Sequence, residues 1–157
     1  MSRKRRLTSE DATPSKKGPH GGFLCRWCKK EVFPPFRTYC SENCAHEWKL
    51  RSDPAYLRGR IFMRDKGICR DCGLNTVALR LKLFDLSEDA RVIVGAQHGY
   101  DAYHAKNLRM WEADHMVAVA DGGGLTGLEN FATRCVPCHR KKSEADRQAR
   151  EALLEGS

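Results

Sequence analysis

Eight cysteines in two groups of four constrain this chain more than any other feature of its sequence. They fall in short pairs that single tight turns can present, namely Cys25/Cys28, Cys40/Cys44, Cys69/Cys72 and Cys135/Cys138. A chain of 157 residues gains little stability margin from apolar burial alone. Some further constraint is therefore expected, and paired cysteines in a small protein indicate either disulfides or metal.

The amino-terminal residues favour metal over disulfides. The basic start of the chain is followed by polar residues with no apolar run of signal-peptide length, and no later window is long and apolar enough to span a bilayer. We therefore expect an intracellular protein of the cytoplasm or nucleus, not secreted and with no membrane partner. In that reducing environment thiols stay free to bind zinc.

Two structural Zn²⁺ sites are predicted, because four thiolates suit tetrahedral zinc and leave no open position for catalysis. One site consists of two C-x2-C pairs far apart in the chain, which would join the start of a domain to its last helix: Cys69, Cys72, Cys135 and Cys138. The other site includes a C-x3-C pair: Cys25, Cys28, Cys40 and Cys44. His46 lies close enough in sequence to replace one of these four ligands.

Composition divides the chain into three expected parts. Residues 1–22 hold six basic and two acidic residues with almost nothing to bury, and are expected to be a disordered basic tail. Residues 23–52 are expected to form the first zinc module, and residues 53–157 the main domain, with an insertion around 74–110. The formal charge of +8 indicates a polyanionic partner, although the tail could equally be a localisation signal or a solubilising arm.

Capping residues and periodicity predict the order of the elements. Ser41 is the expected N-cap of a helix that carries Cys44 and Trp48, and Asp53-Pro54 is expected to begin a second helix that stops at Gly67. The rest of the chain is expected to form, in order, a helix or strand at 76–86, a short strand at 91–94, a helix at 101–109, strands at 111–119 and 130–134, and a helix from 136 to about 154.

A catalytic metal would need ligands other than the cysteines. Hard divalent cations take oxygen ligands and keep several waters, so one or two protein ligands suffice. Asp114 supplies a carboxylate next to His115, whose imidazole can accept a proton from water near neutral pH. Neighbours on an ideal strand point to opposite faces, so both can serve one site only if the strand twists, bulges or ends there. His139 follows a zinc ligand directly, and the Asn130 amide could pin the loop between the two strands.

These residues together resemble the HNH (ββα-metal) nuclease family in its zinc-stapled form. The resemblance is carried by Ala113-Asp114-His115-Met116, by Asn130 and by the run from Cys135 to Lys142, and it covers roughly residues 64–142. It implies an α+β fold: a small zinc-stapled ββα-metal (treble-clef-like) domain, preceded by a zinc knuckle module. It also implies that His115 is the general base, that Asp114 and His139 bind a catalytic Mg²⁺ or Mn²⁺, and that Asn130 has a mainly structural role.

The expected function is hydrolysis of a phosphodiester bond in DNA by a metal-dependent endonuclease. Arg134 and Lys142 are the expected contacts to the DNA backbone, because cations can neutralise successive phosphates. One alternative is a zinc-dependent nucleic-acid-binding module that does not cleave, and that would tolerate loss of Asp114. Another is a protein-interaction module of a larger DNA-processing assembly. Cutting both strands with one site per chain would favour a homodimer.

Overall fold

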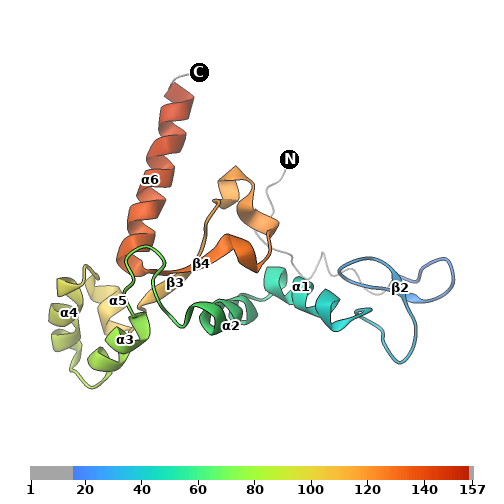
Figure 1. The fold of residues 1–157 in the computed structure, drawn as a ribbon, viewed down its shortest axis with the longest axis horizontal. Coiled ribbons are helices and arrows are strands. Elements are labelled where there is room, and N and C mark those ends of the chain that lie inside the picture. The colour runs from blue at the N-terminus through green and yellow to red at the C-terminus, as the bar shows by residue number, and fades with distance from the viewer. Residues whose placement is uncertain (1–15, 156–157) are drawn as a thin grey trace. The chain divides into compact units, whose positions relative to one another are not determined.

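The computed structural model describes residues 16–155, which divide into two compact units (Figure 1). We call residues 16–60 with 117–130 the N-terminal unit, and residues 61–116 with 131–155 the C-terminal unit. The fold is α+β, as predicted, with two separate two-stranded sheets among the described residues. In chain order the elements are β1 (Phe23–Leu24), β2 (Glu31–Val32), α1 (Glu42–Ser52), α2 (Pro54–Asp65), α3 (Thr76–Phe84), α4 (Glu88–Gln97), α5 (Ala102–Lys106), β3 (Trp111–His115), β4 (Phe131–Cys135) and α6 (Val136–Glu155).

The N-terminal unit begins with a small antiparallel sheet in which Phe23 of β1 pairs with Val32 of β2. Lys17 forms a β-bridge with Phe23, so backbone pairing orders this stretch although it buries few side chains. Residues 16–22 of the predicted tail are thus within the described part, and residues 1–15 lie outside it. Backbone pairing of this kind leaves no trace in composition.

Helices α1 and α2 begin at the predicted caps. The Ser41 hydroxyl accepts the N–H of Cys44 at 3.2 Å, and Asp53 Oδ1 accepts the N–H of Ala55 at 2.9 Å. Trp48 is buried on α1. These bonds satisfy backbone donors that a helix start otherwise leaves unpaired, which is why the sequence located both starts.

The C-terminal unit contains three helices within the expected insertion. Segment 76–86, predicted as helix or strand, is helix α3, and the predicted helix near 101–109 is the shorter α5. The predicted strand at 91–94 is wrong, since these residues belong to α4, whose N-cap is Ser87. A Cβ added at Gly95 would lie 2.7 Å from the Cβ of Ala105, so this close approach of α4 and α5 depends on glycine.

Strands β3 and β4 form an antiparallel hairpin that leads into α6. Strand β3 ends at His115, earlier than predicted, and β4 begins at Phe131, its cross-strand partner. Asp65 at the end of α2 accepts the N–H of Thr133 at 2.9 Å and so attaches α2 to β4. None of the helices described between residues 16 and 155 is long and apolar enough to cross a membrane.

Candidate functional site

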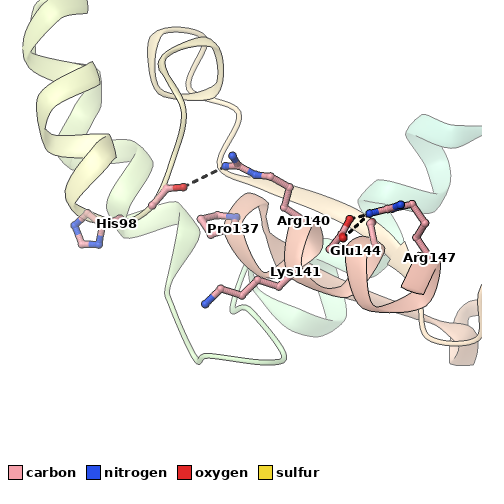
Figure 2. A pocket seen from close by; sticks show the side chains of 8 residues that line it. His98, Pro137, Arg140, Lys141, Glu144 and Arg147 are labelled. Atoms are coloured by element: carbon pink, nitrogen blue, oxygen red, sulfur yellow. Dashed lines mark hydrogen bonds and ion pairs between the residues drawn. The ribbon is translucent and has the colours of Figure 1, made fainter. Parts of the chain in front are cut away.

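An open pocket of about 830 Å³ lies in the C-terminal unit, between the end of α4 and the first turns of α6 (Figure 2). Arg140 donates to the Gly99 carbonyl at 3.2 Å, and Glu144 pairs with Arg147 at 2.6 Å. None of the predicted site residues is among those that line it. The residues predicted to carry chemistry lie elsewhere in this unit.

The second cysteine cluster joins the knuckle before α3 to the start of α6. The four sulfur atoms of Cys69, Cys72, Cys135 and Cys138 all lie within 4.8 Å of one another. Two thiolates on one tetrahedral zinc are roughly 3.8 Å apart, given a Zn–S bond of about 2.3 Å. Burial raises the pKa of the Cys69 thiol, but backbone N–H groups outweigh this effect and lower it to about 7. Burial raises the pKa of Cys135 and Cys138, so it is the spacing of the four sulfur atoms that fits a structural zinc.

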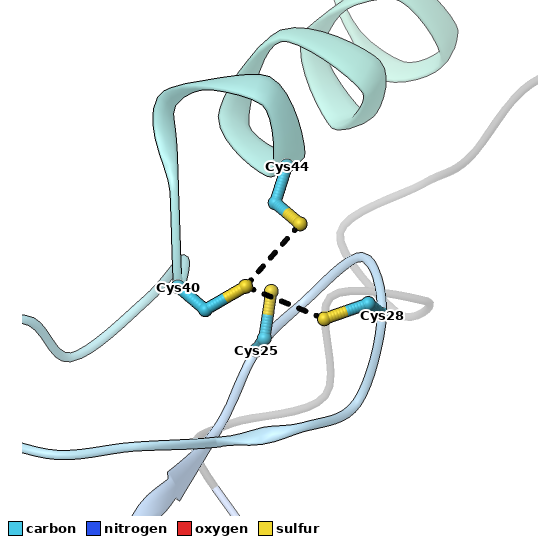
Figure 3. Close-up of side chains that lie close together, drawn as sticks. All are labelled: Cys25, Cys28, Cys40 and Cys44. Carbon is cyan, nitrogen blue, oxygen red and sulfur yellow. Dashed lines mark hydrogen bonds between the residues drawn. The ribbon is translucent and has the colours of Figure 1, made fainter.

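The first cysteine cluster brings a knuckle after β1 against the start of α1 (Figure 3). The Cys40 sulfur lies 3.4 Å from that of Cys28 and 3.4 Å from that of Cys44. His46 is not part of the cluster, and its Nδ1 is 2.7 Å from the Tyr56 hydroxyl. The four thiols themselves could hold zinc.

Asp114 and His139 approach each other from the end of β3 and the first turn of α6. Asp114 Oδ1 lies 3.6 Å from His139 Nε2, which is less than twice a metal–ligand bond of about 2.1 Å. The Asp114 side chain is 15% exposed and that of His139 is 36% exposed. One oxygen and one imidazole nitrogen are therefore close enough to share a divalent ion on the partly open side of the hairpin.

The other oxygen of Asp114 is held by cations. Arg134 donates to Oδ2 at 2.5 Å, and Lys142 Nζ lies 3.9 Å from the same atom. Arg134 also donates from Nε to Asp71, inside the second knuckle, at 2.7 Å. With 9% of its side chain exposed, Arg134 is an internal bridge between two carboxylates and not a solvent-facing cation. Lys142 is also paired with Asp146, one turn along α6.

His115 packs against Phe131, with ring centroids 4.2 Å apart. Its Nε2 is buried and has no hydrogen-bond partner among the described residues. Burial lowers the pKa of His115, the Lys142 ammonium lowers it further, and the Asp114 carboxylate opposes both. The imidazole is therefore neutral near pH 7 and can accept a proton.

Asn130 holds the loop that joins β3 to β4. It accepts the N–H of Val117 at 2.8 Å and donates to the carbonyls of Val117 and Gly123, each at 3.1 Å. A Cβ added at Gly123 would lie 1.9 Å from the Val117 carbonyl oxygen, so this packing requires glycine. Asn130 lies in the short 3-10 turn Leu128–Asn130 and not on the strand, which corrects its predicted position.

Two charged residues near the site were not predicted. Asp71 lies between two cysteines, and nothing in the sequence marks it as a partner of Arg134 across 63 residues. Asp146 could have been found, because an i,i+4 pair of opposite charges on a helix is a recognised pattern. A contact such as that of Asp71 with Arg134, which are far apart in the sequence, is visible only in the folded chain.

Comparison with known proteins assigns this arrangement to a family. Residues 102–145 match the model for "HNH endonuclease". This segment of the chain is therefore similar to HNH endonucleases. This match includes β3, β4 and the start of α6, and therefore Asp114, His115 and His139.

Similar curated proteins carry the description "DNA annealing helicase and endonuclease ZRANB3". The mouse protein is 28% identical over an alignment of 150 residues that covers 83% of this chain and 14% of the relative. The cow protein is 31% identical over an alignment of 128 residues that covers 72% of this chain and 11% of the relative. The human protein is 30% identical over 123 residues, again 72% and 11%. This chain thus spans only a small fraction of the length of these relatives.

A solved structure shows the same fold. The crystal structure of the human ZRANB3 HNH domain matches with a TM-score of 0.54 and 24% identity, covering 66% of this chain and 97% of that chain. The HNH domain therefore sits on the predicted α+β scaffold, with two cysteine clusters that could hold zinc.

Proposed function

We propose that the chain is a DNA endonuclease that hydrolyses phosphodiester bonds with one divalent ion, Mg²⁺ or Mn²⁺, bound by Asp114 and His139. The observation that supports this most directly is the 3.6 Å separation of Asp114 Oδ1 and His139 Nε2. His115, whose pKa burial lowers, follows Asp114 directly at the end of β3. Hydrolysis of a phosphodiester requires a proton acceptor, ligands for a metal ion and nearby cations.

In this mechanism His115 takes a proton from the attacking water. Its lowered pKa keeps it unprotonated at neutral pH, which a general base needs. The Phe131 ring fixes the orientation of the imidazole from one side. A buried imidazole nitrogen without a partner is the kind of group that a bound ligand or substrate satisfies.

The donor set fits a hard divalent ion. A carboxylate oxygen and one imidazole leave the remaining positions to water and to substrate oxygens, as Mg²⁺ and Mn²⁺ prefer. When bound, such an ion polarises the phosphate and neutralises charge that develops on the leaving oxygen. The cysteine clusters have no part in the chemistry, because four thiolates around zinc leave no open coordination position.

Arg134 and Lys142 were both predicted to contact the DNA backbone, and we propose a different role for each. We propose that Lys142 contacts a substrate phosphate, since its ammonium lies near Asp114 and 17% of its side chain is exposed. For Arg134 the two carboxylates favour an orienting role in place of the predicted phosphate contact. Arg134 holds Oδ2 of Asp114, which leaves Oδ1 directed at His139.

DNA is the proposed substrate because the matching family consists of endonucleases and the names of the relatives include DNA. We propose that the protein works inside the cell, where the eight thiols stay reduced. A homodimer or a larger DNA-processing assembly would bring two such sites to the two strands of a duplex.

Nicking of a supercoiled plasmid tests the proposal. Nicking is expected with Mg²⁺ or Mn²⁺, loss of it with EDTA, and return on adding the metal back. His115→Ala should lower the rate by about 10²–10⁴-fold, the usual contribution of a general base. His98→Ala is the matched control, because His98 lines the pocket beside α4 and should leave the rate unchanged. Nicking that survives His115→Ala would count against this mechanism.

A further inference from the structure

Two phenylalanines are exposed in a loop of the N-terminal unit that the proposed reaction does not use. Phe33 follows β2 directly and is 53% exposed, and Phe36 is 63% exposed. The backbone N–H of Phe36 donates to the Phe33 carbonyl at 3.1 Å, so both side chains belong to one tight turn. Large apolar side chains in a small zinc module are normally buried, so two exposed rings in one turn form an apolar surface that is available to a ligand.

The Phe33 ring has a fixed support. A Cβ added at Gly22 would come within 3.0 Å of the Phe33 ring, so the ring lies against the backbone of that glycine. Gly22 is next to β1, which pairs with β2 just before Phe33. The Phe33 ring is held on one side and exposed over about half its surface. Fixing its rotamer when a ligand stacks on it therefore costs little further conformational entropy.

The charge around this turn is strongly positive. Residues 16–40 contain six basic residues and a single acidic one, Glu31. Glu31 is engaged by His20, through the backbone N–H at 2.9 Å and Nδ1 at 2.7 Å. The local charge is thus +5, six cations less one carboxylate, and a zinc with four thiolates would lower it by two. The surface still favours a polyanion.

The fold gathers these cations around the turn. The first cysteine cluster joins the knuckle to the segment after the turn, and Arg26 donates its N–H to the Thr38 carbonyl at 3.0 Å. The Leu24 N–H donates to the Lys16 carbonyl at 3.0 Å, which brings the preceding segment alongside β1. The cations that the structure leaves exposed are Lys16, Lys17, Lys29, Lys30 and Arg37.

We propose that this turn and its cations form a binding site for single-stranded DNA, with Phe33 and Phe36 as base-stacking platforms. Unpaired bases present their faces to aromatic side chains, whereas the bases of a duplex are stacked on one another. Lysines and an arginine beside the rings neutralise the backbone of the same strand. The proposal takes DNA as the ligand from the proposed function, and adds that the substrate has a single-stranded part.

Fluorescence anisotropy with a labelled 20-nucleotide oligo(dT) and the full chain, without added divalent metal, tests this site. Phe33→Ala/Phe36→Ala should weaken binding at least about tenfold, because each stacked base contributes measurably to affinity. Leu81→Ala/Phe84→Ala is the matched control, since both side chains are exposed on α3 at 64% and 59%, and should change binding less than about twofold. Zinc content shows that each variant is folded.

A second readout separates stacking from charge. The phenylalanine variant should bind a 20-base-pair duplex almost as well as the wild type does. Lys29→Gln/Lys30→Gln should instead reduce the slope of log affinity against log salt concentration for oligo(dT) by about 1.4. The site would be overturned if the phenylalanine variant bound oligo(dT) with wild-type affinity, or if it lost equal affinity for the duplex and for oligo(dT). The turn would then be left as a contact for another protein. A chain that binds oligo(dT) through these rings but never nicks a plasmid would instead refute the proposed reaction.

Discussion

Arg134 donates a 2.5 Å hydrogen bond to Oδ2 of Asp114, and the two residues lie on opposite strands of the β3–β4 hairpin. Because the other end of the guanidinium is bound to Asp71, the zinc knuckle and the proposed metal ligand are connected through a single side chain. The carboxylate at the site is therefore oriented by the knuckle that contains Cys69 and Cys72.

Removal of this bridge should destabilise the C-terminal unit. Arg134→Gln leaves Asp114, which is 15% exposed, without its closest cation. Breaking a buried ion pair from one side costs about 3–5 kcal/mol, and the partial exposure of Asp71 reduces this to about 2–3 kcal/mol. Urea denaturation of the zinc-loaded protein measures the loss. Arg140→Gln is the control, because that pair with Asp101 is exposed and should cost under about 1 kcal/mol.

Asn130→Ala should loosen the loop between the strands. Three hydrogen bonds to the backbone of Val117 and Gly123 disappear, each with a net contribution of about 1 kcal/mol. Hydrogen exchange of the amides in 117–123 should quicken by at least about tenfold. Asn107→Ala, which removes one exposed bond to the Tyr103 carbonyl, should leave these amides unchanged. Equal protection in both variants would remove Asn130 from this role.

The stability of the C-terminal unit should fall in acid partly through Asp65. Burial raises the pKa of this carboxyl, but hydrogen bonds from Arg64 and Thr133 outweigh it, so the folded-state pKa lies below its ordinary value. A depressed pKa gives a contribution that is present above the unfolded-state value of about 3.9 and is lost as pH falls through the folded-state pKa.

Asp65→Asn is the variant that isolates this effect. The difference in unfolding free energy between wild type and variant should shrink as pH falls from about 5 to below 4, while the acid sensitivity of the cysteine clusters is common to both. A difference that is constant with pH would show that Asp65 is not the responsible group.

The cysteines should bind two zinc ions per chain, and not form disulfides. Native mass spectrometry of Cys135→Ser should show one zinc ion, with unfolding of the C-terminal unit. Zinc at such a site contributes about 10–16 kcal/mol, comparable with the whole stability of a domain. Eight titratable thiols after zinc release are expected, whereas four disulfides and no zinc would contradict both metal assignments.

Sequence signals predicted the helices whose starts are fixed by contacts between neighbouring residues. Ser41 and Asp53 were found as helix caps because each accepts N–H groups within its own first turn. The run Val92-Ile93-Val94 favoured a strand because its side chains are β-branched, but the Ser87 cap and the packing of Gly95 on Ala105 make it helix. Contacts that distant elements bring can override local preference.

The candidate site likewise contains residues that the sequence predicts and contacts that only the folded chain reveals. Spacing and resemblance predicted Asp114, His115 and His139 as site residues, because the motif lies within a short part of the chain. The use of Arg134 could not be predicted, because it depends on Asp71 lying against the hairpin 63 residues away. Exposure of Phe33 and Phe36 was equally hidden, since apolar residues in a zinc module are expected to be core.

Binding of Mn²⁺ tests the central claim most directly, because it needs no substrate and does not depend on turnover. Titration of the zinc-loaded chain followed by electron paramagnetic resonance should show one Mn²⁺ site, with affinity reduced at least about tenfold in Asp114→Asn and in His139→Ala. Asp121→Asn is the matched carboxylate control and should bind as the wild type does. Unchanged Mn²⁺ binding in both site variants would contradict the account.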